Sequence, residues 1–216
     1  MGLLKLVQDF PTVVLAHGDF PAHRRALQQL QSAATVVCCD GAVEGLLKFG
    51  MEPACIVGDL DSISPQLRER FAGRIHREAE QESNDLTKAM RFCIQKGYRE
   101  VTILGATGKR EDHTLGNISL LADYAKELNV QMLTDYGVLN AIRGDAIFES
   151  FAGQQVSLFC LSPQATITTH ELKYPICNSP LPSLWRGTLN ESLGDCFAVR
   201  CSGGCALVFR EYPRQA

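Results

Sequence analysis

The sequence predicts an α/β protein with an N-terminal parallel-sheet α/β domain followed by a smaller C-terminal antiparallel β-sandwich domain. Up to about residue 135, short β-branched runs alternate with helical patterns, which is typical of a parallel sheet. These runs are nearly continuous in apolar residues, as expected for strands covered on both faces. After Gly137, turn signals recur at intervals of roughly 8 to 12 residues, which favours antiparallel structure. The predicted domains are therefore 1–136 and 137–216, and a single domain with a β extension is the alternative.

The individual elements follow from the same patterns. Strands of the first domain are predicted at 12–16, 35–39, 54–57, 101–104 and 131–134. Helices are predicted at 22–30, 43–49, 64–71, 86–97 and 115–128, with Pro65 at a favoured first-turn position. In the second domain, short segments at 155–159, 165–168 and 206–209 alternate with turn signals at 144–145, 152–153, 162–163, 190–191 and 203–204.

Composition excludes several classes of protein. The formal net charge is -3 and no basic stripe is present, so a nucleic-acid partner is not expected. No apolar run reaches the roughly 18 to 20 residues that span a bilayer, and the N-terminus lacks a secretory pattern. The nine cysteines are scattered and odd in number, which favours reduced, mostly buried thiols. We therefore expect a soluble, cytoplasmic protein.

Acidic residues follow the predicted strands, where open parallel sheets bind their ligands. Asp40 follows the second strand, and Asp59 and Asp61 follow the third. Residues two apart in an extended segment project to the same side, so Asp59 and Asp61 can present two carboxylates to one cation. Asp85 stands at the start of a predicted helix. For a single aspartate the alternative is a cap or a turn, but the pair favours a site for Mg²⁺ with a phosphate ligand.

A glycine-containing stretch follows the fourth strand. Gly105 and Gly108 would let backbone N–H groups approach phosphate oxygens, and Arg110, with Lys109, could neutralise them. The stretch has neither the spacing of a Walker motif nor that of a dinucleotide-binding motif. An ordinary turn with solvated basic residues is the alternative.

Four of these stretches, taken in order, resemble the thiamine pyrophosphokinase family, whose pattern runs DGA/DGG, GDxDS, QDxTDxxKAL and GxxGGRxDHxLxN. The matching segments are 40–42, 58–62, 81–90 and 105–117. The resemblance implies an α/β domain, a C-terminal β-sandwich, a homodimer, and transfer of pyrophosphate from ATP to thiamine with release of AMP.

The resemblance also implies roles for particular residues, in this sequence's numbering. Mg²⁺ and the triphosphate would be held by Asp59, Asp61 and Asp85, which with Arg110 and Asp112 form the expected catalytic set. ATP would in addition contact Asp40, Lys88, Gly105, Gly108, Arg110 and Asp112. Thiamine would contact Glu82, Asp85, Asn190 and Trp185, with the indole of Trp185 facing the cationic thiazolium. Packing of Trp185 in the sandwich core is the alternative.

The chain departs from the family pattern at several positions. Glu82 and Asn84 stand where Asp and Thr are usual, and Lys109 replaces the second glycine of the GGR run. Lys109 excludes a glycine-only backbone angle there unless that backbone is strained. In the C-terminal half, residues 187–191 resemble a G-x-S-N-E segment in which Leu189 replaces the serine.

Two other functions fit the same residues. One is a different Mg²⁺-dependent phosphotransferase or phosphohydrolase, which would not need thiamine to release its product. The other is a catalytically silent thiamine- or nucleotide-binding regulator, which would bind its ligand without forming AMP. The converging carboxylates favour a working enzyme.

Overall fold

The computed structural model describes residues 2–213, which form two compact units. One unit, here the parallel unit, consists of Asp9–Leu120 and Glu127–Asp135. The other, here the antiparallel unit, contains the described residues of 2–8, 121–126 and 136–213. Each unit is described by itself below.

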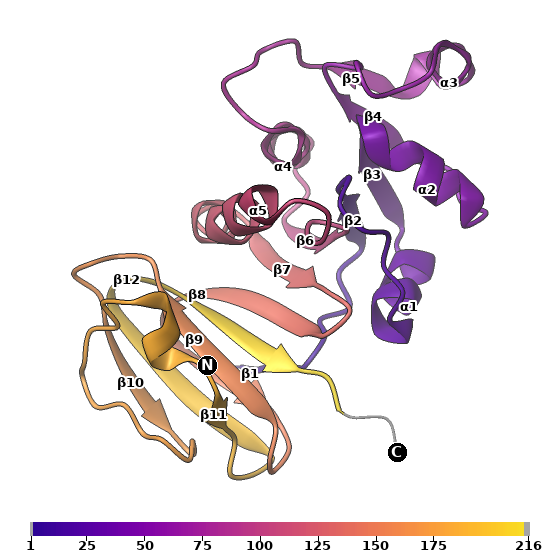
Figure 1. Ribbon diagram of the computed structural model, residues 1–216. Coiled ribbons are helices and arrows are strands. Elements are labelled where there is room, and N and C mark those ends of the chain that lie inside the picture. The colour runs from indigo at the N-terminus through magenta and orange to yellow at the C-terminus, as the bar shows by residue number, and fades with distance from the viewer. Residues whose placement is uncertain (1, 214–216) are drawn as a thin grey trace. The chain divides into compact units, whose positions relative to one another are not determined.

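The parallel unit is built on a six-stranded sheet in the order β7-β6-β2-β3-β4-β5, and every neighbouring pair is parallel (Figure 1). Most residues of its inner strands are buried, as the apolar runs require. The strands are β2 Thr12–Leu15, β3 Thr35–Cys39, β4 Cys55–Gly58, β5 Ile75–Arg77, β6 Glu100–Leu104 and β7 Asn129–Leu133. Only β5 was not predicted, because its three residues include an exposed arginine and carry no apolar run.

Helices connect successive strands of this sheet. They are α1 Arg24–Ser32, α2 Val43–Lys48, α3 Pro65–Arg70, α4 Asp85–Gln95 and α5 Glu111–Tyr124, with short 3-10 turns η1 Asp40–Ala42 and η2 Ala72–Arg74. Ser64 and Asn84 cap α3 and α4 by accepting the N–H groups of Leu67 and Thr87. The predicted start of the last helix at residue 115 is one turn late. Glu111 and Asp112 lie in its first turn, where negative side chains interact favourably with the helix dipole.

The strand order places a topological switch point between β2 and β6. The chain runs outward from β2 through β3, β4 and β5, and then returns to add β6 and β7 on the other side of β2. In open parallel sheets, ligands bind at the carboxyl ends of the strands beside such a switch point.

The antiparallel unit folds around two long strands that bend. They are β8 Gly137–Glu149 and β12 Cys196–Glu211, and they pair along most of their length with an irregularity between Cys201 and Ala206. The first half of β12 pairs with β10 Thr166–His170, and the second half pairs with β9 Gln155–Cys160. The two halves of β12 therefore belong to different layers. The short elements are β1 Leu3–Leu4, β11 Asn190–Glu191 and the 3-10 turn η3 Leu184–Gly187.

Three predicted turns in this unit are wrong. Gly144–Asp145 lies inside β8, Gly203–Gly204 lies inside β12, and Asn190–Glu191 forms β11. Both Gly144 and Gly203 have positive φ angles, so these glycines bend continuous strands instead of ending them.

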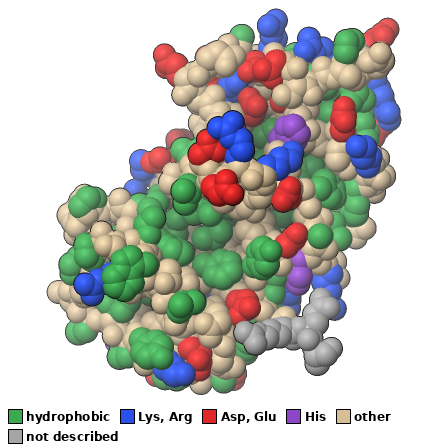
Figure 2. Space-filling model, in the orientation of Figure 1, with side chains coloured by type: hydrophobic (Ala, Val, Ile, Leu, Met, Phe, Trp, Pro, Cys, Tyr) green, Lys and Arg blue, Asp and Glu red, His purple; other side chains and the backbone are tan. Residues whose placement is uncertain are grey.

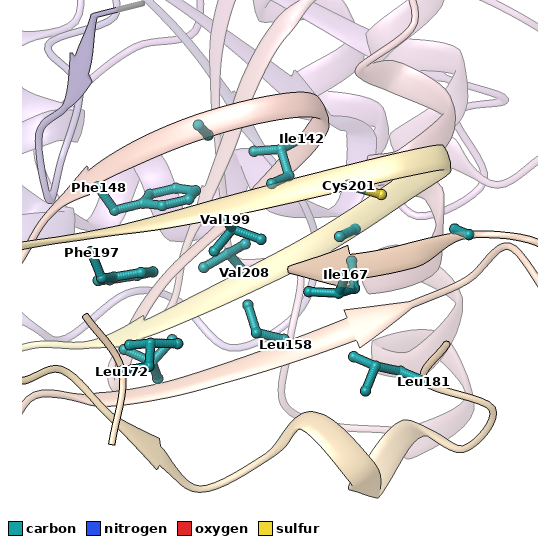
Figure 3. Close-up of a cluster of buried hydrophobic side chains, with 14 residues drawn as sticks. Ile142, Phe148, Leu158, Ile167, Leu172, Leu181, Phe197, Val199, Cys201 and Val208 are labelled. Atoms are coloured by element: carbon teal, nitrogen blue, oxygen red, sulfur yellow. The ribbon is translucent and has the colours of Figure 1, made fainter. Parts of the chain in front are cut away.

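Apolar side chains fill the space between the layers of the antiparallel unit (Figure 3). Phe148 and Phe197 stack with their ring centroids 5.1 Å apart, and Leu158, Ile167 and Val208 are fully buried beside them. Burial of each large side chain contributes about 1.5–3 kcal/mol. A parallel α/β sheet followed by antiparallel strands confirms the predicted fold class.

Two further findings concern the whole described chain. All nine cysteines are free, and five of them are buried. Among the described residues, no helix is long and apolar enough to cross a bilayer.

A buried arginine ties the first strand to this core. The side chain of Arg210 has no exposed surface, and its guanidinium donates to the carbonyl oxygens of Leu4, Lys5, Leu6 and Glu149. It also donates to Oδ1 of Asn140 at 2.9 Å and lies 4.8 Å from the ring centroid of Phe148. Burial lowers the pKa of Arg210 to about 10, which leaves it charged at neutral pH.

We predict that Arg210→Met lowers the free energy of unfolding by about 3–5 kcal/mol, because several buried acceptors lose their donor. Arg200→Met is the matched control on the same strand, since Arg200 pairs with Asp145 at the surface. Chemical denaturation of both variants measures the difference. Equal, small effects of the two substitutions would contradict the structural role of Arg210.

Candidate active site

Two loops are joined at the switch point by backbone hydrogen bonds. After β2, the N–H groups of Gly18 and Asp19 donate to the carbonyls of Gly105 and Thr107, which follow β6, at 2.6 and 2.9 Å. This approach leaves no room for a side chain, since a Cβ on Gly18 would lie 2.3 Å from the oxygen of Thr107. A Cβ on Gly108 would lie 2.1 Å from the carboxylate of Asp19, and Gly105 and Gly108 have φ angles of +64° and +80°. The glycines of the predicted phosphate loop are thus required by loop packing.

A cavity of about 430 Å³ opens beside these joined loops. It lies at the carboxyl ends of the strands, where the fold predicts a ligand. Figure 2 shows acidic, basic and histidine side chains close together on the visible face of the parallel unit. The cavity is lined by the end of β3, by residues that follow β2, β4 and β6, by the loop before α4, and by α4 and α5, including His17, Cys39, Asp59, Gln81, Asn84, Asp85, Lys88, Lys109, Arg110 and Asn117.

Three carboxylates converge beside this cavity. Asp40, Asp59 and Asp61 each place one ligand oxygen within 4.8 Å of the others, a spacing that suits one cation. Asp59 and Asp61 lie close together as predicted, but the predicted reason, an extended segment, is wrong. The segment turns: Leu60 has a φ angle of 76°, and the N–H of Asp61 donates to Oδ1 of Asp59 at 3.1 Å. The turn brings the two carboxylates together.

The environments of Asp40 and Asp59 differ. Asp40 is 1% exposed, and its two oxygens accept the N–H groups of Gly41 and Leu60 at 2.6 and 3.0 Å. Burial, followed by the charge of Asp85, raises the pKa of Asp40 above its usual value. Hydrogen bonds from the backbone of Asp61 and the side chain of Gln81 lower the pKa of Asp59 to about 2. Asp59 is therefore ionised at neutral pH and supplies a permanent negative charge.

Lys88 supplies the opposite charge from α4. Its side chain is 2% exposed, and Nζ lies 3.1 Å from Oδ1 of Asp85 and 3.5 Å from Oδ2 of Asp59. Burial lowers the pKa of Lys88, but the hydrogen bond and charge of Asp85 and the charge of Asp59 outweigh it, so the net shift is upward. Asp85, predicted as a metal ligand, lines the cavity with its carboxylate held by Lys88.

Arg110 lines the cavity and binds Asp112, which lies outside the cavity lining. Two hydrogen bonds, of 3.1 and 2.5 Å, join the guanidinium to the carboxylate, and both side chains are mostly exposed. The hydrogen bond from Arg110 lowers the pKa of Asp112. Such an exposed pair is weakly held, which leaves Arg110 able to exchange its partner for a phosphate.

The loop before α4 contains contacts that the sequence analysis did not single out. Gln81 Nε2 donates to Oδ2 of Asp59 at 3.0 Å. Asn84, which caps α4, donates to Oδ1 of Asn117 at 3.0 Å, and Asn117 donates to the carbonyl of Ala106 at 2.8 Å. Arg91 binds Glu78 and Glu80 and so fixes the same loop. An asparagine directly before a predicted helix is a cap signal, so the cap at Asn84 was visible in the sequence. The contact between Asn84 and Asn117 joins residues far apart in the chain and leaves no local pattern.

The residues predicted to contact thiamine occupy different settings. Glu82 is exposed and lies outside the cavity lining. Asn190 is 4% exposed in the antiparallel unit, where its side chain brackets Tyr174 by accepting the N–H and donating to the carbonyl at 3.0 and 2.7 Å. Trp185, in η3, is 69% exposed, with the guanidinium of Arg186 5.3 Å from its ring centroid. The alternative that Trp185 packs in the core is therefore wrong.

A parallel sheet with acids, a lysine and a glycine-containing loop at its switch point is typical of proteins that bind nucleotide phosphates. Comparison with known families gives the assignment. The model of the thiamin pyrophosphokinase catalytic domain matches residues 26–132, and that of the thiamin pyrophosphokinase substrate-binding domain matches residues 137–209. Together these matches take in most of the chain, and the chain belongs to the thiamin pyrophosphokinase family.

Individual proteins agree with this assignment. The chain is 41% identical over 80 residues to thiamine pyrophosphokinase of Bacillus subtilis, a match that takes in 35% of this chain and 37% of that protein. It is 28% identical over 150 residues to thiamine pyrophosphokinase 1 of Oryza sativa subsp. japonica, covering 62% of this chain and 57% of that protein. These matches thus span less than two thirds of either relative.

Solved structures share the fold over nearly the whole chain. Thiamine pyrophosphokinase from Bacillus subtilis superposes with a TM-score of 0.78 at 23% identity, covering 94% of this chain and 100% of that one. Thiamin pyrophosphokinase from Candida albicans gives a TM-score of 0.78 at 19% identity, covering 97% and 92% of the two chains.

We predict that Gly18→Ala destabilises the protein by about 1–3 kcal/mol, because its Cβ would meet backbone oxygens that cannot move independently. Gly116→Ala is the control, since nothing lies within 4 Å of its Cβ position and the helix α5 gains about 0.5–1 kcal/mol. Thermal unfolding of the two variants should show shifts of opposite sign. An unchanged melting temperature for Gly18→Ala would contradict the close loop approach.

Proposed function

We propose that this protein transfers pyrophosphate from ATP to the hydroxyl of thiamine, giving thiamine diphosphate and AMP. The observation that carries the proposal is the convergence of Asp40, Asp59 and Asp61 beside a cavity at the switch point of the sheet. Membership of the thiamin pyrophosphokinase family supports the choice of substrates.

The three carboxylates are suitable ligands for Mg²⁺, because their oxygens approach one another closely and two of them are exposed or half-buried. When bound, Mg²⁺ would neutralise phosphate charge and orient the triphosphate. Asp85 is a further proposed ligand, and it can reach the cation only if its contact with Lys88 loosens. Lys88 keeps Asp59 and Asp85 close together, so we assign it a positioning role beside the predicted contact with ATP.

The triphosphate would lie along the joined loops. Arg110 would exchange Asp112 for phosphate oxygens, which are strong bidentate partners of a guanidinium. Gly105 and Gly108 keep the loop close to β2 and leave its surface open to a ligand. Catalysis would then come from positioning and from neutralisation of charge, as in other phosphoryl transfers.

The acceptor of the hydroxyl proton stays open among Asp40, Asp85 and Asp112. Burial makes Asp40 a stronger base than Asp112, but almost none of the surface of Asp40 is exposed. Asp112 is accessible, yet Arg110 makes it a weaker base. Exchange of Arg110 onto phosphate would remove this effect.

For thiamine, we propose a direct contact from Trp185. Asn190 would act indirectly, by fixing the backbone of Tyr174. The exposed indole suits a cationic thiazolium, and the bracket from Asn190 fixes the backbone of Tyr174. Glu82 stays a predicted contact. Assembly as a homodimer and a cytoplasmic location also stay predictions, and the nine free cysteines agree with a reducing compartment.

The direct test is to incubate the protein with ATP, Mg²⁺ and thiamine and to measure thiamine diphosphate and AMP. We expect AMP only when thiamine is present. Phosphate release without thiamine would indicate a hydrolase, and ligand binding without AMP would indicate a regulator; either result overturns the proposal.

We predict that Asp59→Asn and Asp61→Asn each lower kcat by more than about 100-fold while the fold is kept, since loss of an outer-shell partner alone costs roughly 10- to 100-fold. Asp123→Asn, an exposed acid paired with Lys126, is the control and should retain full activity. Circular dichroism checks the fold of each variant. Near-normal turnover in both site variants would remove the metal role of these residues.

A further inference from the structure

Three lysine or arginine side chains line the cavity, and they differ in their partners. Lys88 is held by Asp85 and Asp59, and Arg110 is held by Asp112. Lys109 has no such partner: within residues 2–213, no carboxylate forms an ion pair with its ammonium group. Its Nζ donates to the carbonyl oxygen of His17 at 2.9 Å, which uses one of three donors.

The backbone of Lys109 is unusual as well. Its φ angle is +56°, in the left-handed region that favours glycine, and it follows Gly108 at +80°. The family pattern has glycine at this position, so the chain places a strained, charged residue where a glycine would be free of strain. Strained residues of this kind persist where the surrounding structure holds them, and they cluster at ligand sites.

The two observations complement each other. After the left-handed turn at Gly108 and Lys109, Nζ of Lys109 reaches the carbonyl oxygen of His17, near the start of the loop that follows β2. Lys109 therefore bridges the two joined loops, and both Lys109 and His17 line the cavity. Burial, followed by the charge of Lys109, lowers the pKa of His17.

We propose that Lys109 is a phosphate-binding residue of this chain, whose unpaired ammonium contacts the triphosphate of the nucleotide and sets its affinity. The inference rests on the proposed function for the identity of the nucleotide. The chemistry needs only an anion with several phosphate oxygens, which an ammonium with two remaining donors recognises as a point charge.

The test separates charge from backbone strain. Lys109→Met removes the ammonium and keeps a side chain in the left-handed turn, whereas Lys109→Gly removes both. We expect each variant to raise KM for ATP, and Kd for inorganic tripolyphosphate with Mg²⁺ measured by calorimetry, by about 10-fold. Only Lys109→Gly should raise Tm, by roughly 2–4 °C, because the strain is relieved. Lys109→Arg should keep most of the affinity.

Glu171→Gly is the matched control, since Glu171 is also exposed and left-handed, at φ 60°, and lies in the antiparallel unit. It should raise Tm without changing tripolyphosphate binding. Unchanged tripolyphosphate affinity in Lys109→Met would overturn the inference, and a lower Tm in that variant with unchanged affinity would reduce Lys109 to a tie between loops. If the unmodified protein forms no thiamine-dependent AMP, the proposed function fails, while the tripolyphosphate measurement still decides the role of Lys109.

Discussion

The structure of the candidate site depends on an imbalance of charge at the carboxyl end of the parallel sheet. Asp40, Asp59, Asp61 and Asp85 gather there, and Lys88 is the buried cation that approaches two of them. Carboxylates at such distances repel one another unless a positive charge lies between them. The ammonium of Lys88 compensates the charges of Asp59 and Asp85. It does not compensate the whole cluster of Asp40, Asp59 and Asp61, and this excess of negative charge is the physical basis for proposing Mg²⁺ there.

Close packing of two loops makes this arrangement rigid. The loop after β2 and the loop after β6 share backbone hydrogen bonds, and glycines at 18, 105 and 108 permit their approach. On the opposite wall, Asn84 caps α4 and also reaches Asn117 on α5, so the helix that carries Asp85 and Lys88 is fixed to the helix beside it. Groups preorganised in this way suit transfer reactions that depend on positioning.

Local patterns predicted most of the parallel unit and less of the antiparallel unit. Apolar runs located five of six strands in the parallel sheet, because burial on both faces leaves a continuous signal. Strand β8 and the first half of β12 were not predicted, and turns were placed at Gly144 and Gly203, because a glycine that bends a strand looks in sequence like one that ends it. The role of Arg210 was not predicted, since its partners include Leu4 and Asn140, far away along the chain.

The sequence by itself determined the fold class, the acids that follow the strands, and the resemblance that points to thiamine and ATP. Strand periodicity and short motifs are local properties, so they can be recognised without knowledge of the fold. Tertiary structure alone decided that Asp40 joins Asp59 and Asp61, that Lys88 stands between Asp59 and Asp85, and that Lys109 pairs with no carboxylate among the described residues. These relations depend on distances between segments many residues apart, which strand order and loop packing set and which no local pattern records.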